Sequence, residues 1–253
     1  MSRPARFALR HPVIEGIAII DGDELHHLRN VMRMREGAAI ALLTADRAEH
    51  LGRIERFEDH RAIVRIEKTA LSIAATPLIL AAALIKGPRM DFLVEKAAEL
   101  GVTELWPTLC ARGVVRAPGE ERIARWRRLA TAATKQSFAP TPLLLHEATA
   151  FADLIREFAK DTLAIGASSE GPLKVICTMG AEPIASVIRR SPARGIVIAC
   201  GPEGDFDDAE MALAKRAGFV AAGLGINRLR GETAAIAAVS IASAILDEIH
   251  GGD

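Results

Sequence analysis

The arrangement of hydrophobic and polar positions along the chain changes near residue 70. Before that point, three short apolar-rich runs occupy residues 38–43, 50–55 and 61–67 and are separated by turn residues. Strands spaced in this way predict a small barrel-like β-module. A polar helix is expected over residues 23–35, and residues 69–77 are expected to form a linker.

After residue 77 the pattern changes to strands that alternate with helices. Residues 78–85 form a continuous apolar run, which is typical of a strand buried on both faces. Residues 91–100 carry Leu93, Ala97 and Leu100 on one stripe of a helix. Further strands are expected at residues 162–165, 195–200 and 219–224, and a last helix at residues 232–249. This alternation predicts an α/β domain with a largely parallel sheet.

Two of the predicted strands end in glycine-rich loops that open a helix, at residues 201–206 and 223–233. Ligands of open α/β sheets lie beyond the carboxyl ends of the strands, so both loops are candidate walls of a ligand site. Ordinary strand-to-helix turns would also contain glycine. They would not account for Arg228, Arg230 and Glu232 in a single turn.

Several common sites are excluded. Gly223 and Gly225 begin a loop in which Arg228 stands where a dinucleotide fingerprint needs its third glycine. The sequence has no phosphate-loop motif, nucleophile elbow or His-Glu-x-x-His helix. His26 and His27 have no acidic or cysteine partner at ligand spacing, so solvated or RNA-facing histidines fit them better than a metal site. We expect no bound metal.

Composition narrows the class of protein further. The chain has 253 residues, of which 50% are hydrophobic and 25% charged, as in a globular protein. Its 32 basic and 32 acidic residues cancel, so nucleic-acid binding would depend on a local basic face. The absence of tyrosine excludes any tyrosine-based mechanism. Three widely spaced cysteines and uncharged stretches too short to span a bilayer lead us to expect a cytoplasmic protein without membrane contact.

One segment, residues 112–135, is strongly basic. It holds seven basic residues against two acidic ones, with Trp126 among them. A helix with this charge could follow a phosphate backbone. It could equally be the solvated face of an amphipathic helix, and charge alone leaves both interpretations open.

Four short motifs occur in an order that is typical of one family. They are His26-His27-Leu28 to Val31-Met32-Arg33, then Lys86-Gly87 through Glu95-Lys96 to Glu99-Leu100-Gly101, then Gly201-Pro202-Glu203-Gly204, and Leu224-Gly225 to Glu232-Thr233. At these motifs, and over nearly its whole length, the chain resembles the bacterial-type small-subunit ribosomal RNA uridine-N3 methyltransferases of the SPOUT superfamily.

The resemblance implies a fold that composition does not reveal. It implies a PUA-like β-barrel module over residues 1–70, which binds RNA, and a SPOUT-type α/β methyltransferase domain over residues 71–253. The domain would carry a deep trefoil knot, with its knot and cofactor loops at about residues 162–235, and it would form a homodimer. S-adenosylmethionine (SAM) would be bound largely by backbone groups of the knot loops, and the residues implied are Ile165, Gly166, Ala167, Gly201, Pro202, Gly204, Leu224, Gly225, Leu229 and Thr233.

The resemblance also implies methylation of uridine N3 in 16S ribosomal RNA of the small ribosomal subunit. Arg230 is the first candidate catalytic group, because a guanidinium near the uracil carbonyls would stabilise the anion that forms when N3 loses its proton. Glu232 could anchor Arg230, interact with the sulfonium, or only complement the helix N-terminus. Arg112 is a second candidate for the target pocket. The alternatives are another RNA base, a ribose 2′-hydroxyl, or a non-catalytic RNA-binding or assembly protein.

A local basic face is expected to bind the RNA. Its candidate residues are Arg29, Arg33, Arg35, Arg125, Arg128, Lys135 and Gln136. The chain departs from the family at two positions, since Asn227 and Ala139 stand where the family usually has arginine. These departures concern target preference and leave the implied SAM fold intact.

Overall fold

The computed structural model describes residues 4–44, 48–71, 76–137, 139, 141–160, 171–191, 193 and 195–250. The chain folds into two compact units. The first consists of residues 1–75 together with 134–142, and the second of residues 76–133 together with 143–253.

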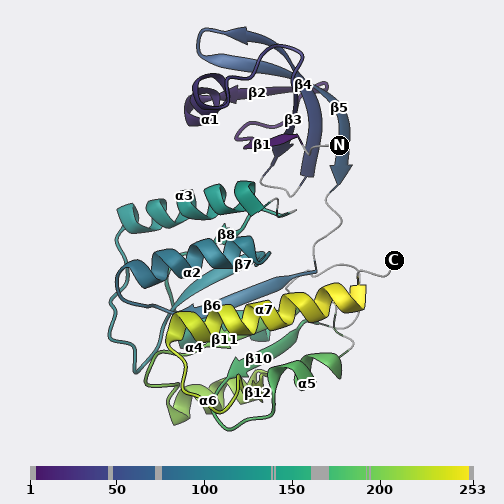
Figure 1. Ribbon diagram of the computed structural model, residues 1–253. Coiled ribbons are helices and arrows are strands. Elements are labelled where there is room, and N and C mark those ends of the chain that lie inside the picture. Colours follow the sequence, from purple (N-terminus) through teal and green to yellow (C-terminus); the bar gives the residue numbers. More distant parts are fainter. Residues whose placement is uncertain are drawn as a thin grey trace. The chain divides into compact units, whose positions relative to one another are not determined.

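The first unit is built on a curled five-stranded sheet in the order β1-β3-β4-β5-β2 (Figure 1). Its strands are β1 (Ala5–Ala8), β2 (Ile17–Asp21), β3 (Ala39–Leu43), β4 (Ala48–Glu58) and β5 (Arg61–Leu71). β1 runs parallel to β3, and the other neighbours are antiparallel. The three strands expected here are present, whereas β1 and β2 were not predicted. Their core is closed by buried side chains such as Phe7, Leu28 and Ile54.

Two details of this unit differ from the sequence prediction. The helix expected over residues 23–35 is shorter, because α1 (Gly22–His26) continues as a π-helical segment η1 (His27–Val31) that ends before Arg33. Arg33 has a φ of 50°, in the left-handed region, which a continuing helix cannot contain. The expected linker is also shorter, because β5 extends to Leu71 and pairs there with Ala48. Residues 72–75 lie outside the described residues.

The second unit contains a sheet in the order β12-β10-β11-β6-β7-β8, with β9 paired to β7, and these neighbouring strands run parallel to one another. Its strands are β6 (Leu78–Ala83), β7 (Glu104–Leu109), β8 (Leu144–Leu145), β9 (Thr149–Ala150), β10 (Leu173–Cys177), β11 (Ile196–Cys200) and β12 (Val220–Ala222). Its helices are α2 (Pro88–Glu99), α3 (Glu120–Ser137), α4 (Phe151–Ala159), α5 (Ile184–Arg189), α6 (Asp208–Arg216) and α7 (Gly231–His250). The last four residues of α3 belong to the first unit.

Helices cover both faces of this sheet. Alternate residues of a strand point to opposite faces, and along β6 Leu78 and Leu80 pack with α2, α5 and α7 while Ile79 and Ala81 pack with α4 and α6. α7 runs along the face seen in Figure 1. Burial on both faces explains why β6 and β11 are apolar at every position.

The expected strands at residues 78–85, 195–200 and 219–224 correspond to β6, β11 and β12, and the last helix corresponds to α7. The helix expected at residues 91–100 begins earlier, at Pro88. The strands β7 and β10 were not predicted. The strand expected at residues 162–165 lies outside the described residues.

Candidate cofactor and substrate site

Three strands of the second unit end in register at one edge of the sheet. Cys177 at the end of β10 is paired with Cys200 at the end of β11 and with Ala222 at the end of β12. The loops that follow these strands therefore leave from the same edge. This is the position at which open parallel sheets bind ligands.

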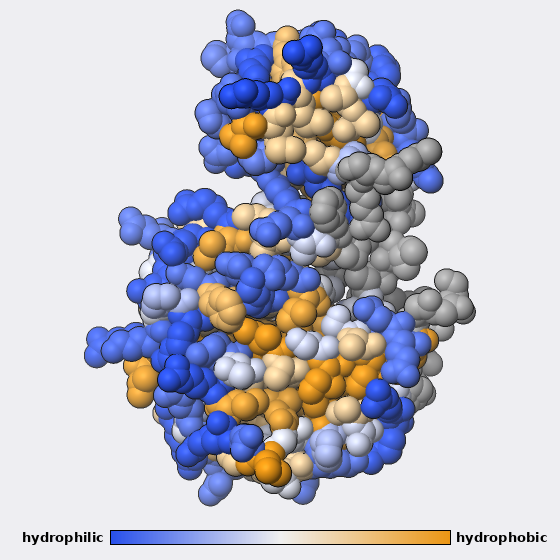
Figure 2. All heavy atoms as spheres, viewed as in Figure 1, coloured by the Kyte–Doolittle hydropathy of each residue, from blue (hydrophilic) through white to orange (hydrophobic). Residues whose placement is uncertain are grey.

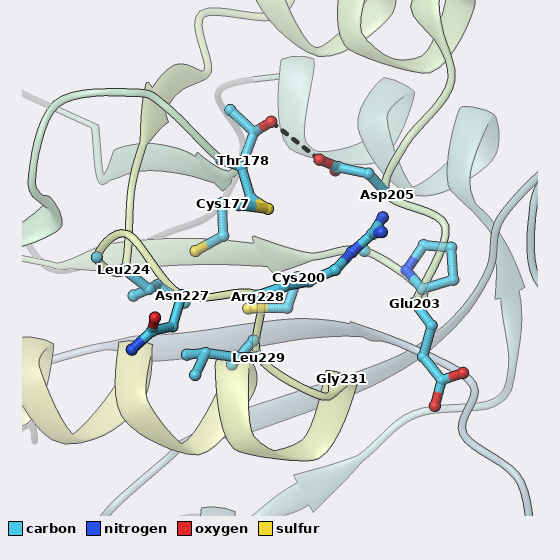
Figure 3. Close-up of a pocket in the computed structure, with 15 residues that line it drawn as sticks. Cys177, Thr178, Cys200, Glu203, Asp205, Leu224, Asn227, Arg228, Leu229 and Gly231 are labelled. Carbon is cyan, nitrogen blue, oxygen red and sulfur yellow. Dashed lines mark hydrogen bonds between the residues drawn. The ribbon is translucent and has the colours of Figure 1, made fainter.

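These loops and the first turns of α7 enclose a pocket of about 610 Å³, part of it open to solvent (Figure 3). The pocket is lined by Cys177, Thr178, Met179, Cys200, Gly201, Pro202, Glu203, Asp205, Leu224, Gly225, Asn227, Arg228, Leu229, Gly231 and Ala234.

One wall of the pocket is fixed by Asp205. Its Oδ2 accepts a hydrogen bond from Thr178 Oγ1 at 3.1 Å, which joins the loop after β11 to the end of β10 (Figure 3). Its Oδ1 accepts from the Phe206 amide at 2.8 Å, and its own amide donates to the Pro202 carbonyl at 2.9 Å. Asp205 has a φ of 62°, so these bonds hold a backbone conformation that is uncommon outside glycine.

The loop after β12 passes very close to the loop after β10. The Gly223 amide donates to the Glu182 carbonyl at 2.7 Å, and the Gly223 carbonyl accepts from the Ile184 amide at 3.0 Å. A Cβ on Gly223 would lie 2.6 Å from the carbonyl oxygen of Ala181. Only glycine fits this crossing, because a side chain there would meet backbone.

A second, more open pocket of about 1,020 Å³ is lined by three arginines, Arg89, Arg228 and Arg230, with Glu203 and Leu229. Arg228, Leu229 and Glu203 line both pockets. An anionic group in the second pocket would therefore lie next to a ligand in the first.

Arg89 carries two ion pairs in this region. Its Nη1 lies 2.7 Å from Glu203 Oε1 and 3.5 Å from Glu232 Oε2. The hydrogen bond from Arg89, with the charge of Arg89 and a smaller contribution from Arg230, lowers the pKa of Glu203. The hydrogen bond to Glu203 and the charges of both carboxylates raise the pKa of Arg89. Glu232 is buried at the start of α7.

Arg112 contacts the backbone of the loop after β11. Its Nη1 donates to the Gly204 carbonyl at 3.0 Å and to the Phe206 carbonyl at 3.4 Å. The side chain packs so closely that a Cβ on Gly204 would lie 3.4 Å from Arg112 Cβ. The sequence prediction for Arg112 concerned the target pocket, and these contacts show that its guanidinium also holds a wall of the cofactor pocket.

Two of the free cysteines, Cys200 at the pocket and Cys110, do not offer a reactive thiolate. Cys177 and Cys200 are buried free thiols on neighbouring strands. The hydrogen bond with Cys177 and burial raise the pKa of Cys200 well above its usual value. Burial raises the pKa of Cys110 to about 12, with a further contribution from Glu210. Cys200 and Cys110 are therefore protonated at neutral pH, and neither is suited to nucleophilic catalysis.

The residues predicted to bind cofactor are partly brought together. Five of them line the first pocket, namely Gly201, Pro202, Leu224, Gly225 and Leu229. Gly204 binds Arg112 through its carbonyl, and Thr233 is an exposed residue of α7; neither is among the lining residues. Ile165, Gly166 and Ala167 lie outside the described residues.

Sequence reasoning missed the contribution of β10 to this pocket. Cys177, Thr178 and Met179 form its third wall. The only signal there was short, the apolar residues Val175, Ile176 and Cys177, because Lys174 interrupts the run. Asn227, Gly231 and Ala234 were also missed as lining residues.

The candidate RNA-binding arginines of the first unit differ in their surroundings. Arg29 donates from Nη2 to the Glu58 carbonyl at 2.9 Å and stacks over the Phe57 ring at 4.9 Å. Arg33 and Arg35 are exposed. The side chains of Arg33 and Arg35 are thus the more accessible to a ligand.

Helix α3 carries most of the basic segment, and Trp126 lies on its buried face. Trp126 is only 2% exposed and donates from Nε1 to Asp91 Oδ1 at 2.8 Å, so it is a core residue and not part of a basic surface. Arg128 is exposed, whereas Arg125 pairs with the other oxygen of Asp91 at 2.8 Å. At the end of α3, Lys135 forms an ion pair with Glu24, and Gln136 is exposed.

Within the residues that the structure describes, no three His, Cys, Asp or Glu side chains gather as a metal-binding group. His26 accepts or donates in a 2.9 Å contact with Asn30, and His27 packs edge-on against Phe7. Across the same part of the chain, no helix has the length and apolar character needed to cross a lipid bilayer.

The chain combines a parallel α/β sheet, with a pocket at three strand-end loops, and a curled β-sheet unit, and this places it in the class of RNA methyltransferases with a PUA domain. Residues 73–243 match the family model described as RNA methyltransferase domain, and residues 20–67 match that of the RNA methyltransferase PUA domain. The chain belongs to this RNA methyltransferase family, whose members use SAM.

Relatives and solved structures agree with this membership. The ribosomal RNA small subunit methyltransferase E of Bacillus subtilis is 28% identical over 234 residues, which cover 88% of each chain. The crystal structure of a ribosomal RNA small subunit methyltransferase E from Neisseria gonorrhoeae, bound to SAM, is 29% identical with a TM-score of 0.78, covering 98% of each chain. The structure of a putative methyltransferase from Legionella pneumophila in complex with SAM is 26% identical with a TM-score of 0.73, again covering 98% of each chain.

Proposed function

We propose that this protein transfers a methyl group from SAM to N3 of a uridine in 16S ribosomal RNA of the small ribosomal subunit. The observation that carries the proposal is the pocket at the ends of β10, β11 and β12, which adjoins an arginine-lined pocket. The relatives named above supply the substrate class, since their names specify small-subunit ribosomal RNA. The uridine N3 target rests on the resemblance of the sequence motifs.

The residues of the first pocket fit SAM. Leu224, Leu229 and Ala234 offer an apolar surface for the adenine ring. The glycines at positions 201 and 225 let backbone groups approach the ligand closely. When bound, SAM supplies a methyl group activated by the sulfonium charge. Nothing in this donor set requires a metal ion.

Methylation at N3 demands two things of the protein. N3 lies on the Watson–Crick edge, so the target uridine has to be unpaired or flipped out of a helix to reach the pocket. N3 also has to lose its proton, which leaves negative charge on the uracil carbonyls. Arg230 lines the second pocket, and we assign it the stabilisation of this charge.

Two other residues have supporting roles in the proposal. Glu232 is held near Arg89 at the start of α7, so we assign it to positioning rather than to contact with the sulfonium. Arg112 holds the carbonyls of Gly204 and Phe206, and we assign it to the pocket wall with a remaining role at the target nucleotide.

For RNA binding we propose the accessible basic residues of each unit. In the first unit these are Arg33 and Arg35, with Arg29 and Lys135 as more constrained candidates and the exposed Gln136 as a polar one. In the second unit they are Arg128 and Arg125 on α3. Contacts of this kind go mainly to phosphates, so they would position the RNA without selecting its sequence.

We also propose that the chain is knotted and dimeric. The crossing of Gly223 with residues 181–184 is the kind of close backbone passage that a threaded chain requires. A trefoil knot would be one of the rare exceptions to the rule that folds are unknotted. A ribosomal RNA substrate would make the protein cytoplasmic.

The test is reconstitution with small ribosomal subunits that lack the modification. The purified protein and SAM are added, and the RNA is digested to nucleosides for mass spectrometry. We expect 3-methyluridine. A 2′-O-methylated nucleoside or a different methylated base would identify another target, and SAM binding without any methylation would favour a non-catalytic RNA-binding role.

A further inference from the structure

Arg89 contacts acidic side chains from two separate walls of the cofactor pocket. Arg89 is the second residue of α2. The helix begins directly after Gly87, whose φ of 68° turns the chain into it. Glu203 belongs to the loop after β11, and Glu232 follows the loop after β12. A single guanidinium thus joins three segments that are far apart in the sequence.

Glu232 is the partner for which this contact matters most. The residue is 8% exposed, and its Oε2 has no hydrogen-bond partner among the residues that the structure describes. A buried carboxylate without a compensating charge is strongly unfavourable. The 3.5 Å contact of Oε2 with Arg89 supplies that charge.

Glu203 is the partner that shapes the pocket. Its neighbours Gly201 and Pro202 line the cavity, and its own carboxylate is turned away from Arg228 and Leu229 (Figure 3). The 2.7 Å contact with Arg89 holds it in that direction. Without this contact the carboxylate would be free to turn toward Arg228 and Arg230, the other two arginines of the second pocket.

We propose that Arg89 is a positioning residue that fixes two walls of the SAM pocket relative to each other by pairing with Glu203 and Glu232. The inference rests on the proposed function, because it concerns the affinity of the pocket for SAM. The lowered pKa of Glu203 and the raised pKa of Arg89 agree with a pair that is charged at neutral pH.

The alternative is that Arg89 forms an ordinary surface ion pair. Exposed pairs contribute little to stability, typically 0–1 kcal/mol, and the Arg89 and Glu203 side chains are 35% and 65% exposed. The two interpretations differ in what they predict for SAM. A surface pair would leave SAM affinity unchanged, whereas a positioning residue would couple to it.

The experiment compares the dissociation constant for SAM, by titration calorimetry, in the full-length wild type, Arg89→Gln and Arg89→Lys. Arg156→Gln is the matched control, because Arg156 forms an exposed ion pair with Asp153 on α4. Thermal melting of each protein without SAM is measured in parallel. We expect Arg89→Gln to bind SAM about tenfold more weakly, a size common for coupling between sites, at a temperature where both variants are fully folded. Its melting temperature should lie below that of Arg156→Gln, because the buried Glu232 loses its compensating charge.

Kinetics separates positioning from catalysis. The loss in Arg89→Gln should appear mainly in KM for SAM, with a smaller change in kcat at saturating SAM than in Arg230→Ala. Arg89→Lys keeps the charge without the two-sided fork of a guanidinium, so its SAM affinity should lie between those of wild type and Arg89→Gln.

Equal SAM affinity in Arg89→Gln and Arg156→Gln would overturn the inference and leave the proposed function standing. A loss of SAM affinity that only reflects a larger unfolded fraction of the variant would overturn the inference as well. If Arg89→Gln does not fold, Arg89→Lys decides, and wild-type affinity in that variant would overturn the inference. Failure of the wild type itself to bind SAM would overturn the proposed function, and the inference with it.

Discussion

Gly223 and Ala181 meet through their backbones alone, with the site of a Gly223 Cβ only 2.6 Å from the Ala181 carbonyl oxygen. The Ala181 carbonyl cannot move aside easily, because the next residue, Glu182, accepts a hydrogen bond from the Gly223 amide. Gly223→Ala should therefore lower the free energy of unfolding by about 1–3 kcal/mol, the usual cost of overpacking. Denaturant unfolding measures this.

Gly171→Ala is the control for this prediction, since a Cβ at Gly171 meets no atom of the described residues within 4 Å and its φ is not positive. Its unfolding free energy should stay near that of the wild type. Gly223→Ala should also weaken SAM binding, because the crossing lies next to Leu224 and Gly225. A Gly223→Ala protein with wild-type stability would show that the crossing tolerates a side chain.

Arg230 lines the arginine-rich pocket, while its carbonyl accepts the Ala234 amide at the start of α7. Arg230→Ala keeps the backbone contact and removes the guanidinium. If the guanidinium stabilises the anionic uracil, kcat should fall about 10²–10³-fold, as for loss of an oxyanion-hole donor. SAM affinity by calorimetry should change little. Turnover near the wild-type rate would remove Arg230 from this role.

Strands with a continuous apolar sequence could be predicted from the sequence, whereas strands that depend on pairing with neighbouring strands could not. β6 and β11 lie in the middle of the sheet and are apolar at every position, which made them visible. β7 and β10 hold Pro107 and Lys174, which interrupt their apolar runs, and pairing with β6 and β11 fixes them as strands. A pattern along one segment cannot reveal such pairing.

The same limit applies to the site. The glycine loops after β11 and β12 were identifiable because glycine and charge cluster there, and five of the residues predicted there to bind cofactor line the pocket. Arg89 carries no such local signal, since its role depends on Glu203 and Glu232, more than 100 residues away in the chain. The burial of Trp126 likewise depends on Asp91 on another helix.

The pKa of Glu203 provides a test of its pairing. Arg89 lowers the pKa of this carboxyl in the folded protein, so the pair stabilises the fold above the unfolded value of about 4.3. This contribution is lost as the pH falls through the lowered pKa. Arg89→Gln should move the Glu203 titration to higher pH in a side-chain carboxyl NMR experiment. Glu182, whose pKa is lowered by Arg190, should titrate unchanged and serves as the internal control.

The salt dependence of RNA binding tests helix α3. Each phosphate contact contributes about 0.9 to the slope of log affinity against log salt on a duplex, and about 0.7 on a single strand. Arg125→Ala with Arg128→Ala should reduce that slope and weaken binding on all sequences alike, with SAM affinity unchanged. Arg128 should account for most of the effect, because Arg125 already pairs with Asp91.

The control for the salt experiment removes the same charge elsewhere. Arg156 lies on α4 and pairs with Asp153, and Lys160 caps the C-terminus of α4 and pairs with Glu157. Their double alanine variant should keep the wild-type slope. An unchanged slope in the α3 variant, or an equal change in both, would contradict the assignment of α3 to RNA.

Helix α7 tests the homodimer. One face of α7, with Ala235, Ala238 and Ala242, is fully buried in its own unit. The neighbouring positions Ile236, Ala237, Ser240 and Ile241 are only half-buried, and apolar side chains gather over α7 on the face shown in Figure 2. The small side chains of Ala237 and Ser240 would let another helix approach closely. We therefore expect light scattering to give the mass of a dimer, twice 27.1 kDa.

Ser240→Arg should convert that dimer to a monomer, because a buried unpaired charge at an interface is strongly unfavourable. Ala212→Arg adds the same side chain at an exposed position of α6, on the opposite face of the sheet, and should remain dimeric. Circular dichroism checks that both variants are folded. A monomeric wild type at working concentration, or a Ser240→Arg protein that stays dimeric, would contradict an interface along α7.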